Sequence, residues 1–143
     1  MNQGEQIMQD RFKFRYVFEK DFGGKTGICY KMPVFNLDDA VRSVFENKIL
    51  EYTNFGYKLI AKNQCTGLKD KNGKLIYEGD VVYKKGSKNW KNEKLLSKVI
   101  WSSNSAAFMI SDENGLHQMP MNSNNIEILG NIYETPELIG GAE

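Results

Sequence analysis

Apolar and polar positions alternate along much of this chain, and the alternation predicts short strands separated by turns. In residues 11–18, basic and aromatic side chains alternate, so Phe12, Phe14, Tyr16 and Phe18 share one face of an expected strand. The favoured reading is a strand with one buried face; the alternative is an exposed surface on which bases stack. Apolar runs at 98–101, 106–110 and 126–133 predict further strands.

One clear helix is expected, from Asn36 to about residue 47 or 48. Asn36 can cap the first N–H groups, and Asp38 and Asp39 place negative charge in the first turn. The apolar stripe at helical spacing consists of Leu37, Val41, Val44 and Phe45. We expect it to pack across a sheet, with partner binding as the alternative. Residues 49–61 return to a strand-like composition.

The densest turn signals lie in residues 66–83, TGLKDKNGKLIYEGDVVY. Asn72-Gly73 predicts a two-residue hairpin turn of type I′, because both residues tolerate positive φ. The charged residues around this turn, Asp70 among them, are expected to be solvated. Glu78-Gly79-Asp80 predicts a second turn, after which Val81 begins a strand.

This stretch resembles the signature of the YopX family, small proteins found mainly in bacteriophages, prophages and other mobile elements. The segment IEILGNIYETPELI at 126–139 is similar to the family's closing segment. FKFR at 12–15 is similar to its opening strand, although YVFE follows where the family usually has Trp-Asp. The resemblance implies a mixed, mostly β domain and a phage-related origin. It implies no established activity and no catalytic residues.

The spacing of short strands and turns predicts a mainly β (α+β) fold containing a small, partly open β-barrel. The strand entry at 79–82 is similar to that of SH3-like barrels. We expect one YopX-like domain over 1–143. Its parts would be a strand–loop–helix region at 1–59, an SH3-like barrel at 60–136 and a tail at 137–143.

Composition narrows the functional classes. The chain has 143 residues and a net charge of +1, which argues against a globally basic nucleic-acid binder. Cys29 and Cys65 are far apart and predict free thiols in a reducing compartment. No apolar run reaches the ~18–20 residues of a membrane span. We expect a cytoplasmic protein of a bacterial host, with no membrane partner.

The sequence contains no catalytic or metal-binding constellation that we can recognise. Residues 23–27 read GGKTG, but Glu19 stands where a phosphate-binding loop needs its first glycine. His117 is the single histidine, which excludes a histidine-based metal cluster. Glu78 and Asp80 would form the polar site if one exists; otherwise Asp80 caps its own turn. We predict no enzyme activity, catalytic residue, metal or cofactor.

The most basic segment, residues 84–98, is expected to be a loop between two barrel strands. It is either a solvated loop or a nucleic-acid contact through Lys84, Lys85, Lys88, Trp90, Lys91 and Lys94. The leading hypothesis is a non-enzymatic phage or prophage accessory protein that acts as a protein-interaction or assembly module, including a homo-oligomer. The alternative is a weak nucleic-acid-binding accessory protein that uses this basic segment.

Overall fold

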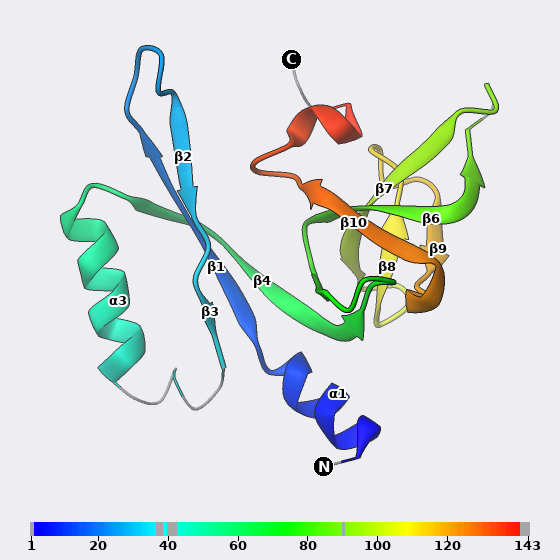
Figure 1. Ribbon diagram of the computed structural model, residues 1–143, viewed down its shortest axis with the longest axis horizontal. Helices are drawn as coiled ribbons and strands as arrows, with labels where there is room; N and C mark the ends of the chain where they lie inside the picture. The colour runs from blue at the N-terminus through cyan, green and yellow to red at the C-terminus, as the bar shows by residue number, and fades with distance from the viewer. Residues whose placement is uncertain (1, 37–38, 40–42, 90, 141–143) are drawn as a thin grey trace. The chain divides into compact units, whose positions relative to one another are not determined.

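The computed structural model describes residues 2–36, 39, 43–89 and 91–140, and its chain forms two compact units, Met1–Cys65 and Thr66–Glu143 (Figure 1). Strand β4, Lys58–Lys69, begins in the first unit and ends in the second. The other elements of the first unit are α1 Gln3–Arg11, β1 Phe14–Asp21, β2 Ile28–Lys31, β3 Val34–Phe35 and α3 Ser43–Asn54. The second unit contains β5 Leu75–Tyr77, β6 Asp80–Lys88, β7 Lys94–Ser102, β8 Ala107–Ser111, β9 Gln118–Pro120, η1 Ser123–Asn125, β10 Ile126–Asn131 and η2 Pro136–Ile139.

The first unit has an aromatic core between its sheet and helix α3. Strand β1 pairs antiparallel with β2, β3 and β4. Tyr16 of β1 lies 5.5 Å from Phe35 and 4.8 Å from Phe45, measured between ring centroids. Phe18 lies 4.9 Å from Tyr52. Tilted and edge-on ring pairs of this kind add to the stability that burial supplies.

Helix α3 ends later than the sequence analysis predicted. It continues to Asn54, so the strand-like reading of residues 49–54 is wrong. The reason is that Ile49 and Tyr52 extend the helical stripe of Phe45 onto the aromatic core. The helix ends in a Schellman motif: Tyr57 N–H donates to Tyr52 O, and Gly56, at φ 83°, donates to Thr53 O.

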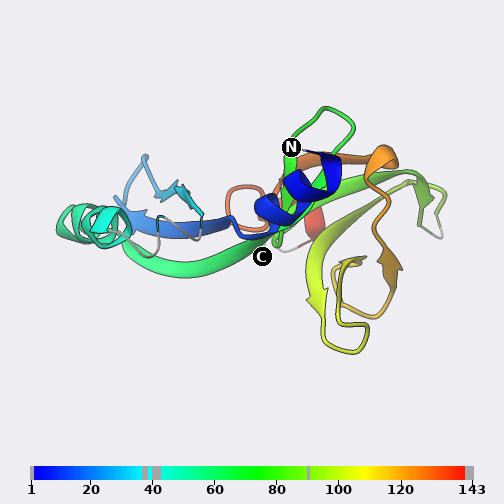
Figure 2. The same ribbon diagram turned by 90° about the horizontal axis from the view of Figure 1, so that it is seen from below.

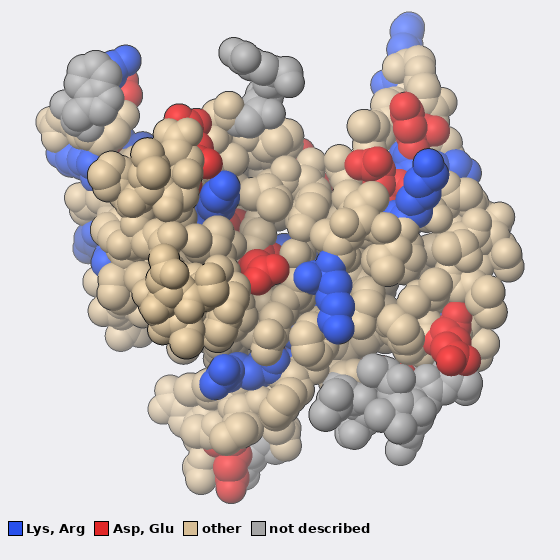
Figure 3. Space-filling view, turned by 180° about the vertical axis from the view of Figure 1, so that it is seen from behind, with Lys and Arg blue, Asp and Glu red and all other residues tan. Residues whose placement is uncertain are grey.

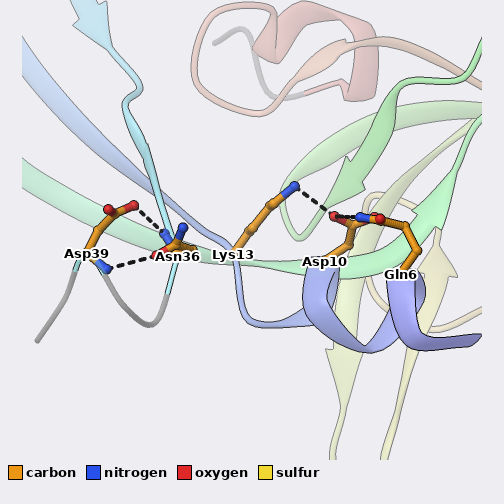
Figure 4. A network of polar contacts seen from close by, with 5 residues as sticks. All are labelled: Gln6, Asp10, Lys13, Asn36 and Asp39. Carbon is orange, nitrogen blue, oxygen red and sulfur yellow. Dashed lines mark hydrogen bonds and ion pairs between the residues drawn. The ribbon is translucent and has the colours of Figure 1, made fainter. Parts of the chain in front are cut away.

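Asn36 and Asp39 form a capping pair in the first unit (Figure 4). Asn36 and Asp39 exchange hydrogen bonds of 3.1 and 2.8 Å between their side chains and backbone N–H groups, as a capping residue should. The predicted stripe residues Leu37 and Val41 lie outside the described residues.

Helix α1 was not expected, because residues 1–9 are polar. Asn2 and Glu5 form a capping box at its start, a signal that the sequence does contain. At its other end, Gln6 Nε2 and Lys13 Nζ both donate to the carboxylate of buried Asp10, at 3.2 and 2.7 Å (Figure 4).

The expected aromatic face of residues 11–18 is only partly correct. Tyr16 and Phe18 are buried, which confirms the favoured reading, but Phe12 precedes the strand and is exposed. Val17, which strict alternation places on the opposite face of the strand, is fully buried. The register of β1 against β4 shifts between Val17 and Phe18, and such a bulge interrupts strict alternation.

The second unit is a curled, five-stranded antiparallel sheet in the order β10-β6-β7-β8-β9 (Figure 2). Its concave side encloses a core of Ile76, Val82, Val99, Ile110 and Ile126. The mainly β, α+β fold with a partly open barrel is therefore confirmed. In the segment assigned to the tail, η2 contacts β7 and ends at Gly140 in the left-handed conformation.

The predicted hairpin at 72–73 is present, but its turn is not of type I′. A type I′ turn would need positive φ at both Asn72 and Gly73, but of these two residues only Gly73 has a positive φ, 83°. Gly73 N–H donates to Asp70 O at 3.0 Å, which closes a four-residue turn starting at Asp70. The difference arises because the Asp70 side chain also accepts the N–H of Asn72, which holds the turn in its observed shape.

Asp70 is buried, not solvated as expected. Its Oδ1 accepts the N–H groups of Asn72 and Lys74 at 2.9 Å each, and its Oδ2 accepts the N–H of Ile128 at 3.1 Å. Burial by itself raises the pKa of Asp70, but the three backbone donors outweigh it and hold the pKa below its ordinary value. One carboxylate thus joins the β4–β5 turn to strand β10.

The turn at 78–80 is confirmed and is tied to two strands. Gly79 adopts φ 85°, donates to Val99 O and accepts from Ile132 N–H, both at 2.9 Å. Asp80 Oδ2 accepts the N–H of Tyr77 at 2.9 Å, so Asp80 does cap its own turn. A glycine is required at 79 because side chains disfavour this φ.

Gly130 has a steric role. Strand β10 bulges between Ile128 and Gly130, and a Cβ at Gly130 would collide with Thr135 Oγ1. That hydroxyl donates to Asn131 O and accepts from Asn131 N–H, at 2.9 and 3.0 Å. The missing side chain therefore lets the chain fold back directly after β10.

We expect Asp70→Ala to lower the free energy of unfolding by on the order of 2–4 kcal/mol, because it leaves three backbone donors without their acceptor. The exposed ion pair of Lys71 with Glu127, 2.8 Å long, supplies the control: Lys71→Ala should cost about 0–1 kcal/mol. Urea unfolding at pH 7 measures both.

The same site predicts a pH dependence. Since the pKa of folded Asp70 lies below 3.8, its contribution is complete well above pH 3.8 and is lost as pH falls through the folded-state pKa. The gap between wild type and Asp70→Ala should therefore narrow in acid. Equal stability of the two proteins at pH 7 would contradict this role of the carboxylate.

Candidate functional site

The basic segment 84–98 forms the two arms of a β-hairpin and not a loop. Strand β6 continues to Lys88 and β7 begins at Lys94, so only residues 89–93 connect them. Asn89 organises this tip: its Oδ1 accepts the N–H groups of Lys91 and Glu93 at 2.9 Å each. The connection is shorter than the predicted loop because the Asn89 side chain supplies hydrogen bonds that hold a tight turn.

The hairpin brings the predicted nucleic-acid contacts together. Lys85, Lys88, Lys91 and Lys94 are exposed, and Lys84 is half-buried opposite Ile126 of β10. Trp90 lies outside the described residues. Lys88 and Lys94 are directly opposite each other across the two strands, an arrangement in which like charges repel.

Lys94 has a favourable contact of another kind. Its Nζ lies 4.0 Å from the centroid of the Tyr83 ring, a cation–π distance. Neither Lys88 nor Lys94 forms an ion pair with an acidic residue in the part of the chain that the structure describes. Their charge is therefore available to an anion from outside.

A hollow of about 720 Å³ lies beside these two lysines, wholly within the second unit. Three elements line it: the β6–β7 hairpin near residues 88–96, the β8–β9 connection at 112–117, and the end of η2 at 138–140. Its apolar lining consists of Leu95, Leu96, Leu138 and Ile139. Sequence analysis missed the hollow, because its walls are far apart along the chain.

The polar residues at the hollow do not form a catalytic arrangement. His117 is exposed. Asp112 Oδ1 accepts the backbone N–H groups of Leu116 and His117, at 3.0 and 3.3 Å, so this carboxylate shapes the turn that contains Gly115. Across the described residues, no group of three or more His, Cys, Asp or Glu side chains could hold a metal ion.

Glu78 and Asp80 lie together at the turn before β6, away from the hollow's lining. Asp80 is buried, and its Oδ2 accepts a backbone N–H. Glu78 is half-buried, and burial raises the pKa of its carboxyl above the ordinary value. A shared polar site at these two residues stays a prediction.

The distribution of surface charge matches the near-zero net charge. On the face shown in Figure 3, Lys and Arg side chains lie in separate groups between acidic and uncharged surface. Both cysteines carry thiols, as predicted. In the described part of the chain, no helix has the length and apolar character to span a membrane.

The two segments that suggested a family are neighbours in the structure: β6 pairs with β10, and Asp70 binds the backbone of Ile128. The family described as YopX protein matches residues 29–140. This chain belongs to the YopX family. Both later motifs lie inside the match, and residues 12–15 lie outside it. YopX is not a known enzyme family, and membership assigns no reaction.

Other comparisons add little about function. No curated protein matches the chain. The crystal structure of protein EF1440 from Enterococcus faecalis is similar to it, with 18% sequence identity and a TM-score of 0.45. That similarity covers 89% of this chain and 96% of EF1440.

We expect Glu78→Gln to raise the melting temperature at pH 7. The folded-state pKa of Glu78 lies above 4.5, so its ionised form lowers stability at neutral pH, and this penalty disappears as pH falls below 4.5. The difference from wild type should vanish near pH 4. Glu113→Gln, at an exposed position, serves as the control in the same thermal scans. A lower melting temperature at pH 7 would contradict the burial argument.

Proposed function

We propose that this protein is a non-enzymatic accessory protein of phage or prophage type that works as an assembly module, pairing with a second copy of itself. The proposed phage or prophage origin rests on family membership. The proposed mode of action rests on the structure of the first unit. The observation that supports it best is an open strand edge at the start of β4.

One side of β4 is occupied and the other is not. Strand β1 pairs with β4 from Lys58 to Gln64. Strand β5 joins the opposite side only after the unit boundary, where Thr66 Oγ1 donates to Ile76 O at 2.9 Å. Within the described residues, the outer edge of 58–63 thus has no neighbouring strand.

The side chains on this edge favour association. Leu59 is 45% exposed and Ile60 is 43% exposed, which is high for aliphatic residues on a strand. An edge that combines unpaired backbone groups with exposed apolar side chains is a template for another strand.

Charge limits how the edge can pair. Lys58 and Lys62 flank the apolar pair, and registers that place them opposite each other are disfavoured. An antiparallel pairing centred on Leu59 avoids the repulsion, because Lys58 then lies opposite Ile60 and Lys62 opposite Gly56. The lysines thus disfavour the antiparallel register centred on Ile60.

We expect light scattering behind a sizing column to give about twice the 16.4 kDa chain mass at high protein concentration. Leu59→Lys with Ile60→Lys should shift the mass toward the single chain, since it adds charge to the edge. Leu50→Lys, at an exposed position of α3, is the matched control and should leave the dimer intact. A monomeric wild-type protein would refute self-assembly.

A second candidate function, binding of a nucleic-acid backbone, is favoured by the β6–β7 hairpin. Residues 84–98 contain six lysines and one glutamate. Two strands can present such side chains to successive phosphates, whose neutralisation releases counterions and makes binding fall steeply with salt.

We expect weak binding of labelled single- and double-stranded DNA and RNA at low salt. Lys88→Glu with Lys91→Glu should weaken binding and lower the slope of log K against log salt by about two. Lys25→Glu with Lys31→Glu makes the same charge change at exposed positions of the first unit and should have little effect. Absence of binding at low salt would eliminate this candidate.

A further inference from the structure

We propose that the hollow of the second unit binds a small amphipathic anion, a molecule with one carboxylate-like group and a short apolar body. The hollow is lined by hairpin residues 88–89 and 94–96, by residues 112–114 and 117 of the β8–β9 connection, and by residues 138–140. This inference is independent of self-assembly through β4, because all three walls belong to the second unit.

The size of the hollow suits a small molecule. Its volume of about 720 Å³ lies within the ~300–1,000 Å³ of ligand sites in proteins. Leucine and isoleucine side chains from β7 and η2 provide the apolar lining that such sites usually have. An apolar ligand body placed there would remove those side chains, all half-buried, from water.

The anion preference comes from Lys88 and Lys94. They lie opposite each other on β6 and β7, so their charges repel, and both line the hollow. Among the described residues no carboxylate forms an ion pair with either one. An anionic group between them would relieve the repulsion and accept charge-assisted hydrogen bonds from both.

The β8–β9 connection restricts the ligand to a single anionic group. Its Asp112 and Glu113 line the hollow, and a polyanion filling the hollow would meet their charge. Asp112 is already committed to the backbone N–H groups of Leu116 and His117, so it cannot turn away without opening its own loop. A ligand charged only at the lysine end fits both walls.

Ligand binding in the hollow can be distinguished from nucleic-acid binding by the hairpin. Lys84, Lys85 and Lys91 lie on the same hairpin and do not line the hollow. Leu138 and Ile139 line the hollow and lie on η2, outside the hairpin. A small anion and a polyanion would share Lys88 and Lys94, but Leu138 and Ile139 would serve only the small anion.

The test is a titration of the full isotope-labelled chain followed by amide NMR, with octanoate, octan-1-ol and octylamine as probes. We expect octanoate to cause saturable shifts confined to residues 88–96, 112–117 and 138–140, with octanol weaker and octylamine weakest. Lys88→Gln with Lys94→Gln should weaken octanoate about tenfold or more, since it removes both charged donors. Leu138→Asn should weaken octanoate and leave nucleic-acid binding unchanged.

The control variant is Lys84→Gln with Lys85→Gln, which removes the same charge from the same hairpin outside the hollow. It should leave the octanoate affinity unchanged, and the spectra themselves report whether each variant is folded. Equal affinity for octanoate and octanol, shifts without saturation, or shifts centred elsewhere would overturn the proposal.

Discussion

The second unit depends on one buried carboxylate. Asp70 accepts two N–H groups of its own turn and a third from Ile128, 58 residues later in the chain. A buried carboxylate is tolerated only when its oxygens are satisfied, so the turn and strand β10 must both be in place. Lys71 N–H, which donates to Ile126 O at 2.9 Å, reinforces the same junction. Local turn geometry and long-range strand pairing are therefore coupled through one side chain.

This coupling explains what the two YopX motifs have in common. The first contains Asp70 and the turn at Gly79; the second contains Ile128, the bulge before Gly130 and the Asn131–Thr135 hydrogen bonds. Their side chains satisfy backbone groups or leave room for the chain to fold back. The motifs thus identify the family largely through its architecture, although Leu138 and Ile139 at the end of the second motif also line the hollow.

The candidate functional surfaces differ in the chemical groups that they expose. The outer edge of β4 at residues 58–62 has no neighbouring strand among the described residues and carries exposed aliphatic side chains. The β6–β7 hairpin offers cations, two of which repel each other beside an apolar hollow. Assembly therefore requires different residues from anion binding. Polyanion and small-anion binding share Lys88 and Lys94, and Leu138 on one side and Lys84 with Lys85 on the other distinguish them. Glu78 is a fourth feature: burial raises the pKa of its carboxyl above the ordinary value.

Local patterns in the sequence determined much of the architecture: the mainly β class, the turns at Gly73 and Gly79, the capping role of Asn36 and the thiol state of both cysteines. Residues close together in the sequence set these features, through their periodicity and their turn stereochemistry. Tertiary structure alone decided that Asp70 is buried and that α3 extends through Tyr52. It also decided that Lys88 and Lys94 lie on strands and that a hollow adjoins them. Each of these requires a partner distant in sequence, such as Ile128 for Asp70 or Phe18 for Tyr52. A local sequence pattern does not indicate which distant segment supplies the partner.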